Sequence, residues 1–161
     1  MATPTTLPAT FVAGDVLTAA QMNNLRGAFR ILQVVSATYS TLTTSTSGTY
    51  ADTGLTVSIT PSSTSSKIFV VANHSVYNDT ANTAAGIRIV RGSTSLTATI
   101  NVSYSPTAAI ASSWSMNYLD SPATTSATTY KTTFARTNGA GTVTVQPSSD
   151  AATITVFEIS A

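Results

Sequence analysis

The side chains that could perform acid–base, nucleophilic or metal chemistry are few in this sequence. There is a single histidine, His74, and no cysteine, so carboxylates are the main ligands left for a metal ion. Serine is so frequent that a Ser-His-Asp arrangement can be assembled on paper at many places, and it therefore predicts nothing. We expect no catalytic residues, no metal site, no cofactor and no enzyme activity.

The acidic residues have a simpler interpretation than catalysis. Most of them fall at turns or at the start of a helix, where we expect them to cap backbone groups and aid solubility: Asp15, Asp52, Asp79, Asp120 and Asp150. Glu158 differs because it lies among apolar residues of a predicted strand. There we expect a paired, partly buried carboxylate.

Two groups of residues could bind a ligand. Trp114, Tyr118 and Tyr130 could form an aromatic face for a sugar, but their alternation with small polar residues favours packing in the core. The polar segment 77–83 is the better candidate because it carries amide groups in a predicted loop. Its candidate binding residues are Tyr77, Asn78, Asp79 and Asn82, and an ordinary solvated loop is the alternative.

The elements that would position these residues are strands. Thr (32 residues) and Ser (22) make up a third of the 161 residues, and the β-branched side chain of Thr favours strands. Period-two alternation predicts strands within 29–41, 48–61, 67–77, 86–100, 109–120, 128–137, 141–147 and 151–160. About eight short strands separated by turns predict an all-β fold, an antiparallel β-sandwich or jelly roll.

Particular residues are expected on particular faces of these strands. Leu55, Val57 and Ile59 should share one face of their strand, as should Tyr130 and Phe134, while Ile154 and Val156 alternate with Phe157 and Ile159. Gly92-Ser93 and Asn138-Gly139 are expected to be turns, and a loop is expected over 78–84. The first half of segment 67–77 is apolar on both faces, so this strand is expected to be central and covered on both sides.

The first 30 residues have a different pattern. Pro4 and Pro8 indicate an extended arm, and a short helix follows, with Thr18 as its N-cap and Gln21 completing a capping box. A helix of about two turns is too short to be stable alone. It should therefore dock through Met22, Leu25 and Phe29. We expect two parts: an N-terminal arm and helix (1–30) and a β domain (31–161).

The charge pattern narrows the range of partners. The net charge is +1, and the closest basic pair, Arg26 and Arg30, is too small a cluster for a nucleic-acid backbone. No apolar run is long enough to span a membrane, and the N-terminal residues lack the pattern of a secretory signal. We expect neither nucleic acid nor a membrane as a partner. Because the strands carry few charges or prolines to prevent edge pairing, a symmetric oligomer is expected to bury the vulnerable surfaces.

The opening residues resemble the N-terminal segment of many tailed-bacteriophage virion proteins. The matching positions are Phe11, Gly14, Asp15, Leu17, Thr18, Ala19 and Asn23. The remainder resembles the β-rich domains that follow such segments, through Y-x-D-T-G-L-x-V-x-I-T-P at 50–61 and T-V-F-E-I at 155–159. Those domains are similar to the trimeric jelly rolls of tumour-necrosis-factor and complement head proteins. The resemblance implies a homotrimer that is made in the host cytoplasm and located on the virion.

The resemblance leaves two main functional hypotheses. The first is a capsid decoration (cement) protein whose N-terminal arm binds the major capsid protein or another virion subunit. Its attachment residues would be Phe11, Leu17, Met22, Leu25, Arg26, Phe29 and Arg30. The absence of a coiled-coil stem favours this hypothesis. The alternative is a short tail fibre or tail-tip adhesin that binds a host surface glycan or receptor; a carbohydrate-active enzyme subunit and a host-encoded trimeric lectin are weaker hypotheses.

Overall fold

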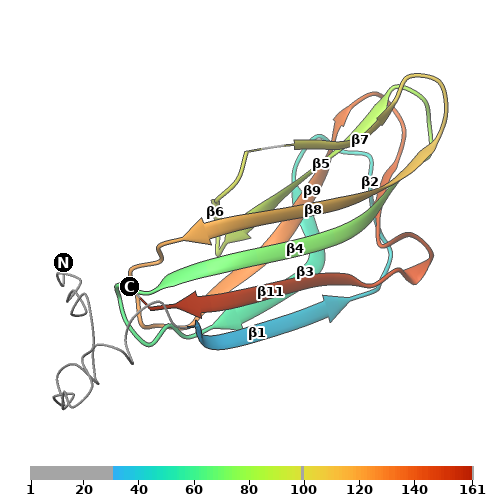
Figure 1. The fold of residues 1–161 in the computed structure, drawn as a ribbon. Helices are drawn as coiled ribbons and strands as arrows, with labels where there is room; N and C mark the ends of the chain where they lie inside the picture. The colour runs from blue at the N-terminus through green and yellow to red at the C-terminus, as the bar shows by residue number, and fades with distance from the viewer. Residues whose placement is uncertain (1–30, 99, 161) are drawn as a thin grey trace, which may run out of the picture.

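The computed structural model describes residues 31–98 and 100–160, which form two antiparallel β-sheets packed face to face (Figure 1). The predicted N-terminal arm and helix lie outside the described residues. So do all the predicted attachment residues: Phe11, Leu17, Met22, Leu25, Arg26, Phe29 and Arg30.

The two sheets divide the strands between them. Sheet A contains β1 (Ile31–Tyr39), β2 (Thr43–Ser45), β4 (Lys67–Asn78), β8 (Ile110–Asp120), β10 (Val143–Val145) and β11 (Ala152–Ile159). Sheet B contains β3 (Ala51–Ile59), β5 (Thr83–Arg91), β6 (Thr94–Ser95), β7 (Ile100–Ser105) and β9 (Thr128–Asn138). A short 3₁₀ turn, Pro147–Ser149, separates β10 from β11.

The strand order identifies the sandwich as a jelly roll. β2 continues the line of β1, β10 that of β11, and β6 that of β7, so the 11 assigned strands follow eight lines. The lines run β1-β11-β4-β8 in sheet A and β3-β9-β5-β7 in sheet B (Figure 1). Neighbours along the chain thus mostly lie in opposite sheets, as they do when eight strands form two Greek keys. The predicted fold class is confirmed.

The core lies between the sheets and contains the residues that alternation placed there. Leu55, Val57 and Ile59 of β3 are buried, and they face Ile154 and Val156 of β11 across the sandwich. Tyr130 and Phe134 of β9 are fully buried. Trp114 is also buried and Tyr118 packs against the core, so the prediction of core packing for these aromatic residues is confirmed.

The prediction for β4 is half right. β4 is central, because it pairs with β11 and β10 on one side and with β8 on the other. The prediction that both of its faces are covered is wrong for the described chain, because burial alternates along the strand. Ile68 and Val70 point into the core, whereas Phe69 and Val71 are only half buried on the outer face.

Two predicted turns are confirmed, and one of them requires glycine. Arg91 pairs with Thr94 around Gly92-Ser93. β9 ends at Asn138, and Gly139 follows with φ +78°. A Cβ at Gly139 would overlap the carbonyl group of Asn82, so both the backbone angle and the close approach exclude larger residues.

Candidate interaction surface

One end of the sandwich, here called the proximal end, is where the described chain begins. Ile31, the first residue of β1, pairs with Ile159, the last residue of β11. Ile159 pairs in turn with Lys67, the first residue of β4. The 30 residues that precede Ile31 therefore join the sandwich at this end.

The outer face of sheet A carries a row of large apolar residues near the proximal end. Val34 pairs with Phe157, Phe157 with Phe69, and Phe69 with Leu119, so one residue from each of four neighbouring strands enters the row. Paired residues of antiparallel strands lie on the same face of the sheet. The centroids of the two phenyl rings are 6.2 Å apart.

This row and its isoleucine neighbours form a continuous apolar surface. We define the apolar band as Ile31, Val34, Phe69, Leu119, Phe157 and Ile159. Ile31, Val34 and Leu119 are 58%, 53% and 54% exposed, which is high for side chains of this kind. Contiguous exposed apolar residues mark interaction sites more often than isolated ones do.

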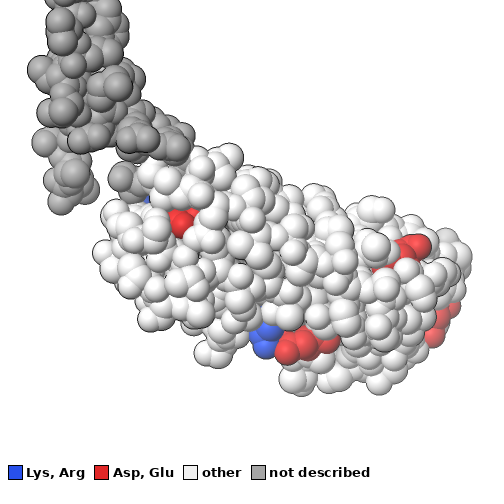
Figure 2. All heavy atoms as spheres, turned by 90° about the horizontal axis from the view of Figure 1, so that it is seen from below, with Lys and Arg blue, Asp and Glu red and all other residues white. Residues whose placement is uncertain are grey.

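Beyond the apolar band, the outer face of sheet A is covered with hydroxyl and amide groups. The hydroxyl groups of Ser36 and Thr155 are 2.9 Å apart, and the side-chain amide of Asn73 donates to the Thr153 hydroxyl at 3.2 Å. Lys67, at the proximal end, is the one charged residue among the described outward-facing strand positions of sheet A. In the view from the β1 side, most of the described surface is uncharged, and the charged atoms gather in a few clusters (Figure 2).

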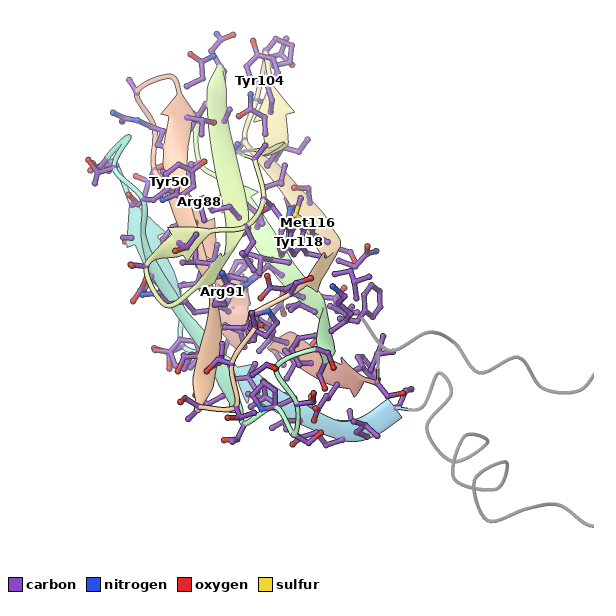
Figure 3. All side chains as sticks on the ribbon, turned by 90° about the vertical axis from the view of Figure 1, so that its left-hand side faces the viewer. Tyr50, Arg88, Arg91, Tyr104, Met116 and Tyr118 are labelled. Carbon is purple, nitrogen blue, oxygen red and sulfur yellow. The ribbon has the colours of Figure 1, made fainter. Side chains whose placement is uncertain are left out.

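The outer face of sheet B has a different character. The Lys131 ammonium group lies 2.8 Å from the Asp52 carboxylate, and the Arg88 guanidinium group lies 3.8 Å from the ring centroid of Tyr50. Figure 3 shows Tyr50 and Arg88 next to each other. Charged groups therefore face solvent on sheet B, while sheet A exposes apolar and hydroxyl groups.

Below the apolar band, the Glu158 carboxylate holds the proximal end together. Its oxygens accept hydrogen bonds from Gln33 Nε2 at 2.6 Å, from the Ser62 backbone N–H at 2.7 Å and from the Ser62 hydroxyl at 2.6 Å. Burial raises the pKa of this carboxyl group, but the hydrogen bonds outweigh burial and the pKa falls to about 2. The carboxylate is therefore paired, as predicted, and its described partners are the neutral hydrogen-bond donors of Gln33 and Ser62.

A second inward-facing carboxylate, Asp120, joins the two sheets at the same end. Arg91 donates to both of its oxygens at 2.8 and 2.7 Å, and the Tyr130 hydroxyl donates at 2.6 Å. Burial and the neighbouring Asp120 carboxylate raise the pKa of Tyr130, so its phenol stays protonated. The expectation that Asp120 acts as an exposed turn residue is wrong, because the strand end turns its carboxylate into the interior.

The lone histidine is a structural residue in the middle of the sandwich. His74 Nε2 lies 2.8 Å from the Thr132 hydroxyl on the opposite sheet, and Nδ1 lies 3.3 Å from Gln146 Nε2. Desolvation by burial lowers its pKa to about 4. Its ring also packs beside Trp114. No group of three or more His, Cys, Asp or Glu residues in the described chain is arranged to hold a metal ion.

The predicted binding loop at the opposite, distal end is shorter than expected. β4 ends at Asn78 and β5 begins at Thr83, so the loop covers 79–82 rather than 78–84. Asn78 is fully buried, and its amide donates to the carbonyl groups of Thr83 and Ser103, each at 2.8 Å. The prediction that Asn78 binds a ligand is therefore wrong, because its side chain is buried and its hydrogen bonds connect β4 to Thr83 and Ser103.

Each of the other three predicted loop residues has its own surroundings. Tyr77 points outward from sheet A. The Asp79 carboxylate accepts hydrogen bonds from the Thr80 hydroxyl and the Thr142 backbone N–H, both at 2.7 Å, and these bonds lower its pKa. Asn82 has φ +57°, and its Oδ1 accepts a hydrogen bond from the Tyr104 hydroxyl at 3.1 Å. Tyr104, at the distal end in Figure 3, was not among the predicted residues.

Comparisons with known proteins find structural similarity at low sequence identity. No family model and no curated protein matches this chain. It is similar to a chain from the T=1 particles derived from infectious bursal virus, with 12% identity, a TM-score of 0.41, and coverage of 80% of this chain and 36% of that one. It is also similar to a chain from the Gx strain of infectious bursal disease virus, with 13% identity, a TM-score of 0.39, and coverage of 78% of this chain and 36% of that one.

The described chain thus spans about a third of the length of the viral chains that it matches, at 36% coverage. At these TM-scores the assignment of the jelly roll rests on the strand order described above. The described part of the chain also contains no helix that is long and apolar enough to cross a membrane.

Proposed function

We propose that this chain is a structural protein of a bacteriophage virion, a homotrimeric decoration (cement) knob that binds the assembled capsid through its N-terminal arm. The observation that carries the proposal is the position of the apolar band. It lies at the proximal end, where residues 1–30 join the sandwich, so the predicted attachment segment adjoins a surface that is suited to contact with other subunits.

The character of the remaining surface supports a structural role. The chain is 8% charged, and hydroxyl groups cover the described outer face of sheet A beyond the apolar band. The described carboxylates that point inward, Glu158 and Asp120, are saturated by internal donors. Stabilisation of the particle would follow from mass action, because a protein that binds only the assembled shell stabilises it. The proposed role requires no catalytic step.

The attachment step can be tested in the full chain. Leu25→Asp places a charge among the predicted apolar contacts of the N-terminal helix, and Asn24→Asp is a matched control in the same segment. Both proteins are mixed with particles that lack this protein, and co-sedimentation is measured. We expect Leu25→Asp to abolish binding and Asn24→Asp to retain it. Equal binding of both variants would contradict attachment through the arm.

A second candidate function is favoured by the pair Tyr104 and Asn82. Their side chains present an aromatic ring, 49% exposed, beside an amide at the distal end. Aromatic rings and amides are the groups that recognise neutral sugars. A tail adhesin would bind a host glycan here, and a glycan array tests this with Tyr104→Ala and Asn82→Ala. Binding that both variants lose would support the adhesin.

A further inference from the structure

The outer face of sheet A has no described partner. From β1 to β8 it carries the apolar band at the proximal end and neutral hydroxyl and amide groups toward the distal end. Val34 and Leu119 stand at the two sides of the row, each more than half exposed. Phe69 and Phe157 lie between them and are partly exposed.

We propose that this face is the self-association surface of the protein, and that a second copy of the same chain covers it. The proposal rests on the proposed function in one respect, because it assigns the surface through which the suggested homotrimer assembles. The apolar band would form the buried centre of the contact, and the hydroxyl-covered part would form its more polar continuation.

The absence of charge favours a second copy as the occupant. In a homotrimer whose copies turn this face toward the three-fold axis, a charge near the axis lies close to its own copies in the other two chains, so a face rich in one sign repels itself. Lys67 is the one charged residue among the described outward-facing strand positions of sheet A, and its ammonium group lies at the proximal edge, 2.7 Å from the Ser121 hydroxyl. The outer face of sheet B, in contrast, carries three charged residues: Asp52, Arg88 and Lys131.

The size of the face also fits a protein partner. Four strands about 4.8 Å apart, rising about 3.3 Å per residue over the 12 residues of β4, give a flat area of roughly 750 Å². A stable interface buries about 800 Å² on each partner. The face is uncharged along most of this length. A short segment of the same chain would cover only the apolar band, so the extent of the uncharged face favours a second copy.

The decisive variants place charges in the apolar band at exposed positions, so that the fold of the single chain is retained. The band variant is the full chain with Val34→Glu and Leu119→Glu. The matched control carries Thr56→Glu and Ser58→Glu on the outer face of sheet B, where both positions are exposed. Circular dichroism of each variant establishes that the β fold is intact.

Sedimentation equilibrium of the full chain then measures self-association. We expect the wild type and the control to form the same oligomer, and the band variant to have a dissociation constant raised by at least about 100-fold, because it would bury unpaired carboxylates. A wild type that is monomeric at micromolar concentration would overturn the proposal. So would a band variant that assembles like the control.

Cysteine cross-linking locates the surface independently. The chain has no cysteine, so Leu119→Cys and Ser58→Cys each introduce a single thiol. A short bifunctional reagent should link chains through residue 119 and not through residue 58. Protection of the residue-119 thiol in a monomeric protein would show that a segment of the same chain covers the band, which would also overturn the proposal.

Particle binding of the band variant separates this inference from the proposed function. A monomeric band variant that still binds particles through its arm would support both the assigned surface and arm attachment. Loss of particle binding by Leu25→Asp, combined with unaltered assembly of the band variant, would uphold attachment and refute the assigned surface.

Discussion

Phe69 and Phe157 lie on neighbouring strands of sheet A with their ring centroids 6.2 Å apart and their planes tilted by 41°. Both rings point away from the core, and each is only half buried. An aromatic pair of this kind contributes about 0.5–1.5 kcal/mol beyond the burial of its area. In a single copy of the chain, part of the area of both rings remains in contact with water.

The first prediction concerns this pair. If a second copy covers it, the Tm of the wild type should rise with protein concentration, because association stabilises only the folded state. Phe69→Ser with Phe157→Ser should remove most of that dependence. Differential scanning calorimetry over a 100-fold range of concentration measures it. A Tm that is independent of concentration in the wild type would contradict the prediction.

The second prediction is a loss of stability in mild acid caused by His74. Desolvation lowers the pKa of His74 from 6.5 to about 4 in the folded state, so between these pH values the unfolded state binds more protons. The free energy of unfolding should therefore fall by roughly 3 kcal/mol as the pH drops from about 6.5 to about 4. Urea unfolding across this range measures the change.

His74→Gln is the variant that isolates this effect. It should cost about 1–3 kcal/mol at neutral pH, because the Thr132 hydroxyl and the Gln146 amide lose the ring nitrogens as partners. In return, its stability should change much less between pH 6.5 and 4. If the free energy of unfolding of the variant fell with pH as steeply as that of the wild type, His74 would not be the group responsible.

The third prediction is that protonation of Glu158 destabilises the fold at a lower pH than protonation of His74 does. Its hydrogen bonds hold the folded pKa at about 2, below the ordinary value of 4.5, so its contribution to stability is complete above about pH 4.5 and is lost as the pH falls toward 2. Glu158→Gln should cost about 1.5–3 kcal/mol at pH 7, since it replaces hydrogen bonds to a charged acceptor. It should also make the free energy of unfolding less dependent on pH below about pH 4.5. Equal stability of the two proteins at pH 7 would contradict the role of this carboxylate.

The fourth prediction compares two ion pairs. Asp120→Ala should destabilise the fold by roughly 2–4 kcal/mol, because it leaves the buried Tyr130 hydroxyl and the Arg91 guanidinium group without their acceptor. Asp52→Ala removes the partner of Lys131 on the exposed face and should cost less than about 1 kcal/mol. Chemical denaturation of both variants measures the difference, and equal costs would refute the assignment of Asp120 to the interior.

Local pattern was enough to predict most of the strands and their inward faces. Leu55, Val57 and Ile59 alternate with polar residues, and period-two alternation alone places them on one face of β3. The turn at Gly139 was predictable for a related reason, because few residues other than glycine tolerate its backbone angle.

Properties that depend on pairing between distant strands could not be predicted in the same way. The apolar band exists because Val34, Phe157, Phe69 and Leu119 come into register across four strands that are far apart in the chain. The two-sided apolar pattern of 67–71 is the available signal, and it predicts that both faces are covered without indicating which residues of the other strands join the row. Asn78 was misplaced because strand β4 runs one residue past the apparent start of its loop.

Cryo-electron microscopy of the virus particles to which the proposed function assigns this chain would test that function most directly. A decoration protein predicts three-fold knobs over the icosahedral shell, with the apolar bands of neighbouring copies facing one another and residues 1–30 on the capsid surface. Density confined to the tail tip would favour the adhesin instead. Particles that contain no copy of this protein would contradict a structural role in the virion.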